Sequence, residues 1–335
     1  MLNLPDHQNY GDLAVAISKF RQLELGKKVY IEINEFLDLI DYYLTKNQVS
    51  TSRKILDFAI QFYPDCYELK LTEAQLLIEA NLHNQAAHKL KNLYQNHHDD
   101  FGLLMLIAIN YAKSGIVNKG MKFFDKALSP LDDEEKAPVL FAISQTFIQI
   151  GRYDVASFYL TKAYQITPND SNLILELAFC FERTEKFLNS KKLYISYLKD
   201  NPFSHLAWYN LGVVYSKLDK NKKAVEAFDY ALALSPEFSS AYFNKANIML
   251  NSKKYSKAIE EYSSVISYEK DNASAFYLRG LAYMQSNQFK NAIKDFIKSL
   301  KIDDKQPETW YHTALIYYKF NQINKAKKAI HKALS

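Results

Sequence analysis

The chain has 335 residues, of which 48% are hydrophobic and 24% charged, a balance that is ordinary for a folded protein in water. With only 8 Gly and 8 Pro it has little material for hairpins or phosphate-binding loops, so we expect almost all of it to be helical. The net charge of +5 is uneven, because residues 1–170 hold 17 Lys/Arg against 21 Asp/Glu and residues 171–335 hold 25 against 16. The start of the chain lacks the pattern of a signal peptide, and no stretch approaches the ~18 consecutive apolar residues of a membrane helix. We therefore expect a cytoplasmic protein without membrane contact.

The first predicted element is a helix over DLAVAISKFRQLEL, residues 12–25. Asp12 is expected to be its N-cap, and Gly26 is expected to end it. One face of the helix is apolar and is formed by Leu13, Ala16, Ile17 and Phe20. A stack of repeats needs its terminal apolar face covered, so we predict that segment 1–32 is an N-terminal cap.

The sequence then repeats at one constant interval, which separates Trp208 from Tyr242, Tyr242 from Phe276, and Phe276 from Trp310. A small residue recurs at the same interval at Ala224, Ala258, Ala292 and Ala326, and a third column reads Phe228, Tyr262, Phe296 and Ile330. An interval of this length predicts a stack of repeats, in which each repeat buries its apolar face only against its neighbours.

One stretch, AWYNLGVVYSKLDKNKKAVEAFDYALALSPE at 207–237, resembles the tetratricopeptide repeat (TPR). Eight residues stand at that family's pattern positions: Trp208, Leu211, Gly212, Tyr215, Ala224, Phe228, Ala231 and Pro236. The stretch VYIEINEFLDLIDYYL at 29–44 resembles the start of a group of uncharacterised bacterial TPR proteins. The resemblance implies an all-α fold, a right-handed superhelical α-solenoid of stacked antiparallel helix pairs.

Steps of this constant interval place nine repeats over residues 33–335, about nine-tenths of the chain. Their predicted starts are 33, 67, 101, 137, 171, 205, 239, 273 and 307. One step is two residues longer, and we place the excess in an acidic loop at 129–138. Prolines that stop the second helix of a repeat are expected at Pro64, Pro168, Pro202 and Pro236. The sequence ends in the Lys-rich NKAKKAIHKALS, so either this helix is its own cap or the natural chain continues, and an uncovered end would favour an end-to-end homodimer.

Two columns of the repeats are expected to hold small residues, because the two helices of a pair cross closely there. The first reads Ile40, Ala74, Ala108, Ser144, Ala178, Gly212, Ala246, Gly280 and Ala314. The second reads Ser52, Ala86, Gly120, Ala156, Ser190, Ala224, Ala258, Ala292 and Ala326. All but Ile40 are Gly, Ala or Ser, as this packing requires.

No catalytic motif stands out, and we predict no enzyme activity, no cofactor and no functional metal. The only adjacent metal-ligand types are HHDD at 97–100, which lack the separated, rigid positions of a defined site. Cys66 and Cys180 lie in different repeats and are expected to be free thiols.

The first helix of each repeat is predicted to line a concave groove. Its most exposed column reads Leu37, Leu71, Met105, Phe141, Leu175, Tyr209, Phe243, Tyr277 and Tyr311. The predicted peptide-binding residues are Tyr209, Asn210, Phe243, Asn244, Asn247, Tyr277, Tyr311 and His312. Aromatic rings give contact area at small entropic cost, and Asn side chains can bond an extended peptide backbone. The alternative is that these residues, which are common in TPR sequences, help the repeats to stack.

The leading interpretation is a non-enzymatic protein–protein interaction scaffold that binds a partner peptide or helix in this groove. The carboxylate clamp of some TPR domains is not expected, because only Asn244 fits it among the matching positions Tyr209, Val213, Asn244, Ser274 and Leu278. An RNA-binding helical-repeat protein and a self-assembling structural element are the alternatives. We do not expect nucleic acid as the partner, because the groove column is not rich in Arg or Lys.

Overall fold

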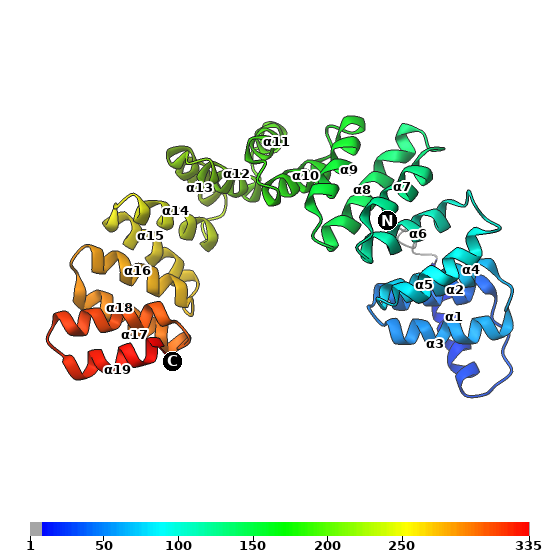
Figure 1. Cartoon of the computed structure of the whole chain (residues 1–335), viewed down its shortest axis with the longest axis horizontal. Coiled ribbons are helices and arrows are strands. Elements are labelled where there is room, and N and C mark those ends of the chain that lie inside the picture. The colour runs from blue at the N-terminus through cyan, green and yellow to red at the C-terminus, as the bar shows by residue number, and fades with distance from the viewer. Residues whose placement is uncertain (1–8, 335) are drawn as a thin grey trace. The chain divides into compact units, whose positions relative to one another are not determined.

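The computed structural model describes residues 9–334, which form nineteen α-helices and no β-strand (Figure 1). The chain divides into two compact units, Met1–Pro168 and Asn169–Ser335, and each is described by itself. The first unit contains α1 (Asn9–Glu24), α2 (Ile33–Thr45), α3 (Val49–Phe62), α4 (Tyr67–Glu79), α5 (His83–Tyr94), α6 (Phe101–Lys113), α7 (Val117–Leu128), α8 (Asp133–Gln149) and α9 (Tyr153–Ile166).

The second unit is built in the same way. It contains α10 (Ser171–Arg183), α11 (Phe187–Asp200), α12 (His205–Lys217), α13 (Asn221–Leu234), α14 (Ser239–Asn251), α15 (Tyr255–Tyr268), α16 (Ala273–Gln285), α17 (Phe289–Ile302), α18 (Pro307–Lys319) and α19 (Ile323–Leu334). Within each unit, consecutive helices from α2 onward pack as antiparallel pairs. None of the helices within residues 9–334 is both long and apolar enough to cross a membrane.

The helix α1 packs on the first pair. Its predicted apolar face is confirmed, since all four of its residues lie in a buried cluster with Phe36, Leu39 and Leu56 of α2 and α3. The predicted N-cap is wrong, because the helix begins at Asn9 and Asp12 lies in its first turn. The helix shares its core with α2 and α3, so the separation of 1–32 as a segment of its own stays a prediction.

The first helices of eight pairs begin at the residue numbers where the repeats were placed: Ile33, Tyr67, Phe101, Ser171, His205, Ser239, Ala273 and Pro307. The exception is α8, which begins at Asp133, inside the predicted acidic loop. Asp132 accepts a hydrogen bond from the Glu135 amide at 2.9 Å, and Glu135 accepts one from the Asp132 amide at 3.2 Å. The loop prediction is wrong at this end because acidic side chains stabilise a helix N-terminus, and here they form its first turn.

The turn within each pair has the same backbone conformation in all nine pairs. One residue of every turn has a positive φ, between 56° and 84°: Asn47, Asn81, Gly115, Gly151, Glu185, Asp219, Lys253, Asn287 and Asn321. The next amide then bonds a carbonyl five residues back, as from Gln48 to Tyr43 at 2.8 Å. This is the hydrogen-bond pattern that closes a helix through a left-handed residue.

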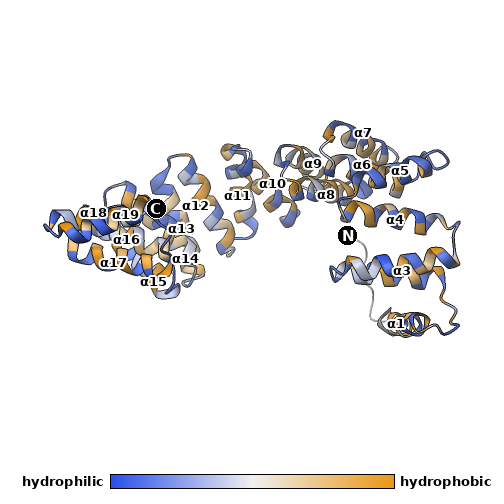
Figure 2. Cartoon of the chain, turned by 60° about the horizontal axis from the view of Figure 1, so that its bottom comes forward, coloured by the Kyte–Doolittle hydropathy of each residue, from blue (hydrophilic) through white to orange (hydrophobic). Residues whose placement is uncertain are grey.

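Small residues at the crossings leave room for rings of the second helix. A Cβ atom on Gly212 would lie 2.6 Å from Cε1 of Phe228, and one on Gly280 would lie 2.6 Å from Cε1 of Phe296. Ile40 is accommodated because the residue sixteen positions later is Leu56 rather than an aromatic ring, and both are fully buried. Figure 2 shows that hydrophobic and hydrophilic residues alternate along helices such as α3.

Candidate functional site

The first helices of the last four pairs, α12, α14, α16 and α18, carry all eight predicted binding residues. We call the surface that these side chains form the first-helix face. Tyr209 and Asn210 come from α12, Phe243, Asn244 and Asn247 from α14, Tyr277 from α16, and Tyr311 and His312 from α18. Tyr311 is 47% exposed, whereas the other seven residues are half-buried. Half-burial means that each of the seven also contacts its own unit.

Tyr209 is held by a neighbouring repeat. Its hydroxyl accepts a hydrogen bond from Nδ2 of Asn244 at 2.9 Å, and its ring packs edge-on against Phe238 at 4.9 Å. Burial raises the pKa of the Tyr209 phenol, so the group is neutral across the physiological range. The Tyr209–Asn244 bond joins α12 to α14, which supports the stacking role that the sequence left open.

The two asparagines of α14 are each bonded through only half of the side-chain amide. Asn244 uses Nδ2 as a donor to Tyr209, while Asn247 uses Oδ1 as an acceptor from the Tyr262 hydroxyl at 2.6 Å. Oδ1 of Asn244 and Nδ2 of Asn247 form no hydrogen bond within the described chain, and neither atom is buried. One acceptor and one donor, three residues apart on α14, are therefore fixed in place and available.

The C-terminal part of the face is aromatic. The ring of Tyr277 lies 6.0 Å from Phe296 and 5.9 Å from His312, and Tyr311 packs edge-on to His312 at 5.4 Å. Nδ1 of His312 lies 2.7 Å from the carbonyl oxygen of Glu308, one turn earlier in α18. On α14, Phe243 packs edge-on against Tyr262 at 5.9 Å.

Sequence reasoning missed an acidic side chain beside this face. Oε1 of Glu182, at the end of α10, accepts hydrogen bonds from the Tyr194 hydroxyl at 2.7 Å and the Ser190 hydroxyl at 3.3 Å. Burial raises the pKa of the Glu182 carboxyl, although the two hydroxyl donors oppose this shift.

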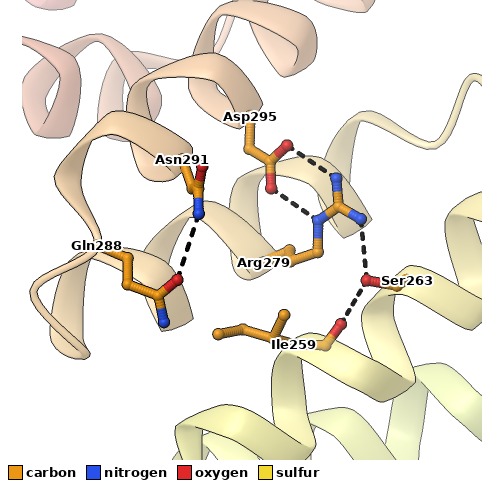
Figure 3. A network of polar contacts seen from close by, with 6 residues as sticks. All are labelled: Ile259, Ser263, Arg279, Gln288, Asn291 and Asp295. Atoms are coloured by element: carbon orange, nitrogen blue, oxygen red, sulfur yellow. Dashed lines mark hydrogen bonds and ion pairs between the residues drawn. The ribbon is translucent and has the colours of Figure 1, made fainter.

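Sequence reasoning also missed a group of ion pairs in α13–α17. Figure 3 shows Arg279 of α16 between Asp295 of α17 and Ser263 of α15. One repeat earlier, the Lys245 ammonium lies 2.8 Å from Asp229 and 2.7 Å from Glu261. The signal was present in the sequence, because the repeat that begins at residue 205 has the apolar residues Leu211 and Ala227 at the positions where the next two repeats have a cation and an anion.

Hollows in the surface lie between successive second helices. In the second unit, one of about 430 Å³ lies between α11 and α13, with Trp208 stacked on Tyr230 at 4.5 Å along its wall. In the first unit, hollows of about 540 and 480 Å³ lie between α3 and α5 and between α7 and α9. These hollows are a second class of surface that a partner could use.

Residues of the cluster at 97–100 make structural contacts. Asp100 is the N-cap of α6 and accepts a hydrogen bond from the Leu103 amide at 2.7 Å, while the His97 ring packs on Tyr67 at 4.3 Å. Across the described part of the chain, no three His, Cys, Asp or Glu side chains are grouped to hold a metal ion.

Family models match several of the repeats. Two models described as "Tetratricopeptide repeat" match residues 137–170 and 205–238, and one described as "TPR repeat" matches 246–287 and 280–320.

Two curated relatives are matched over part of the chain. The chain is 30% identical over 108 residues to "Uncharacterized protein ycf37" of Guillardia theta, covering 28% of this chain and 61% of that protein. It is 26% identical over 214 residues to the peroxisomal targeting signal receptor of Kluyveromyces lactis, covering 53% of this chain and 37% of the receptor. The chain thus spans less than two thirds of the length of either relative.

Two solved structures match more than half of the chain. The Pseudomonas aeruginosa pilF structure matches with a TM-score of 0.50 at 16% identity, over 59% of this chain and 90% of that one. A crystal structure of MamA matches with a TM-score of 0.48 at 23% identity, over 52% of this chain and 96% of that one.

Proposed function

Because the chain carries tandem tetratricopeptide repeats, we propose that it is a non-enzymatic interaction scaffold whose first-helix face binds an extended peptide segment of a partner protein. The relative named as a targeting signal receptor supports a binding role, although the likeness covers only part of both chains. The proposal depends on the chemistry of the face itself.

The observation that carries the proposal concerns the side-chain amides of Asn244 and Asn247 on α14, each of which has one polar atom without a hydrogen bond in the described chain. A peptide backbone presents N–H donors and C=O acceptors, and Oδ1 of Asn244 and Nδ2 of Asn247 are a complementary acceptor and donor. Because Tyr209 and Tyr262 already orient the two amides, little side-chain entropy is lost when a peptide binds. Such hydrogen bonds involve the peptide backbone alone and do not select for particular side chains. The neighbouring rings of Tyr209 and Tyr277 supply apolar contact.

The test uses 12-residue peptides selected from a random library on the wild-type chain, with affinities measured by fluorescence anisotropy. The variant Asn244→Ala/Asn247→Ala is expected to bind them about tenfold more weakly, because two hydrogen bonds of about 0.5–1.5 kcal/mol each are lost. The matched control is Asn189→Ala/Asn221→Ala, which removes two exposed asparagines from the second helices α11 and α13.

A second control separates binding from stacking. Tyr262→Phe removes the hydroxyl that orients Asn247 and leaves the amide itself in place, so it is expected to weaken peptide binding less than the α14 double variant does. If the α14 double variant binds the selected peptides as tightly as wild type, the first-helix face is not the binding surface.

A further inference from the structure

Glu182 is an exception in its column of the repeat. The eight equivalent residues, at steps of the repeat, are uncharged: Leu44, Ile78, Ala112, Ile148, Ser216, Leu250, Met284 and Tyr318. A carboxylate in a half-buried position loses part of its hydration. This loss destabilises the folded chain unless hydrogen bonds or a nearby cation compensate for it. The two hydroxyl donors give part of that compensation.

The hydrogen bonds to Glu182 all reach one oxygen. Tyr194 and Ser190 both donate to Oε1, and within the described chain Oε2 accepts no hydrogen bond and forms no ion pair with a lysine or arginine. Oε2 is also not among the buried polar atoms that lack a partner, so it is accessible from the surface. The carboxylate is therefore anchored at one oxygen, and the other oxygen is open.

The open oxygen lies beside the proposed peptide contacts. Glu182 is hydrogen-bonded to Tyr194 of α11, and α11 packs against α12, the helix that carries Tyr209. Burial and, after it, the Glu182 charge raise the pKa of the Tyr209 phenol. A fixed carboxylate next to an aromatic ring is a suitable site for a cationic side chain. Such a side chain forms an ion pair with the carboxylate and packs on the face of the ring.

We propose that the peptide bound on the first-helix face carries a lysine or arginine, which pairs with Glu182 beside the ring of Tyr209. The inference rests on the proposed function and narrows its partner to a segment with a basic residue next to apolar or aromatic ones. Arginine fits best, because its planar fork can bond the open oxygen and stack on the ring together.

The test has two parts and uses the same selected 12-residue peptides. Their sequences are expected to be enriched in Arg or Lys relative to the unselected library. Glu182→Gln, which keeps the shape and the acceptor for Tyr194, is expected to weaken binding about tenfold, as for one lost charge-assisted bond. The control Glu226→Gln makes the same charge change at an exposed position on α13 and is expected to leave affinity unchanged.

A peptide with norleucine in place of its basic residue completes a double-mutant cycle with Glu182→Gln. It is expected to bind wild type and Glu182→Gln equally, because the coupled pair is already broken. If selected peptides need Asn244 and Asn247 but show no basic enrichment, or bind Glu182→Gln like wild type, the inference is wrong and the proposed function stands. If the peptides also bind the α14 double variant as tightly as wild type, or if no peptide is selected, both the inference and the proposed function are wrong.

Discussion

Arg279 and Asp295 form a bidentate ion pair between α16 and α17, with Nε–Oδ2 and Nη2–Oδ1 distances of 2.7 and 2.8 Å. Both side chains are largely covered, with 17% and 8% of their surface exposed. The pair is the counterpart of Lys245 and Glu261, which stand at the same positions one repeat earlier and lie 2.7 Å apart. In both repeats the cation is on the first helix and the anion sixteen residues later on the second.

The same pair of positions takes other forms elsewhere in the chain. In the first unit, Glu73 and Lys89 occupy it with reversed polarity at 2.6 Å. In the repeat that begins at residue 205, it is apolar, with Leu211 and Ala227, which lie in the floor of the hollow between α11 and α13. The fold therefore requires that the two positions match each other and does not require a particular charge.

This matching predicts the outcome of swapping pairs between repeats. Arg279→Leu alone leaves the Asp295 carboxylate covered and without its cation, so the free energy of unfolding should fall by about 3–5 kcal/mol. Arg279→Leu/Asp295→Ala installs the Leu211–Ala227 pair and should remain within about 1.5 kcal/mol of wild type. Urea unfolding followed by circular dichroism measures both. A double variant as unstable as the single one would contradict the account.

Lys253 has a φ of 58° at the turn between α14 and α15, where Gly115 and Gly151 stand in other repeats. The left-handed conformation costs a residue with a Cβ about 1–2 kcal/mol, and glycine avoids this at a smaller entropic cost. Lys253→Gly should therefore raise the free energy of unfolding by about 0.5–1 kcal/mol. Gly151→Ala should lower it, and a thermal melt of the two variants that shows the opposite signs would refute the prediction.

Gly280 lies directly against the ring of Phe296. A Cβ atom at residue 280 would lie 2.6 and 2.7 Å from two ring carbons, so Gly280→Ala should destabilise the chain by about 1–3 kcal/mol despite its better helix propensity. Gly280→Ala/Phe296→Leu copies Ala74 and Leu90 of the repeat that begins at residue 67. The double variant should be more stable than the sum of the single changes predicts, as measured in a double-mutant cycle. Additive effects would show that the ring does not contact this position.

The pKa of Glu182 predicts a pH dependence of stability. Burial raises the pKa of this carboxyl in the folded chain above its value in the unfolded chain. Well below the unfolded pKa both states hold the proton and nothing is lost, whereas the stability falls as the pH rises through the folded pKa. Glu182→Gln should therefore be more stable than wild type at pH 7, and the difference should shrink toward pH 4.5.

Glu226→Gln serves as the control for this measurement, because its side chain is exposed and the carboxylate keeps its hydration. Thermal melts of the three proteins at several pH values give the comparison. A Glu182→Gln advantage that stays constant from pH 7 to pH 4.5 would mean that the carboxylate is not desolvated in the folded chain.

The fold could be predicted from the sequence because its packing repeats. The residue types at Trp208, Gly212 and Phe228 recur at one constant interval along the chain, and each column reports one contact between helices. The start of α8 could not be found in this way, since Asp132 and Glu135 act locally and outside the repeat. The turn residues were missed because their common feature is a backbone angle, which residues as different as Gly115 and Lys253 adopt.

The candidate site was only partly predictable. The column pattern placed Tyr209 and Asn244 on first helices, but the bond between them depends on how neighbouring repeats stack. Glu182 was missed because its position is apolar in most repeats, and its partners Ser190 and Tyr194 come from a different helix. Charges that interrupt an apolar column are the sequence signal that could have identified it.

The most direct test of the central claim is the location of a bound peptide. A selected 12-residue peptide with one aromatic residue replaced by benzoylphenylalanine would be photo-crosslinked to the wild-type chain, and the attachment points read by mass spectrometry. We predict attachment to α12, α14 and α16, around Tyr209, Phe243 and Tyr277. Attachment in the hollow between α11 and α13, at Trp208 or Tyr230, would contradict the account and assign binding to the second helices.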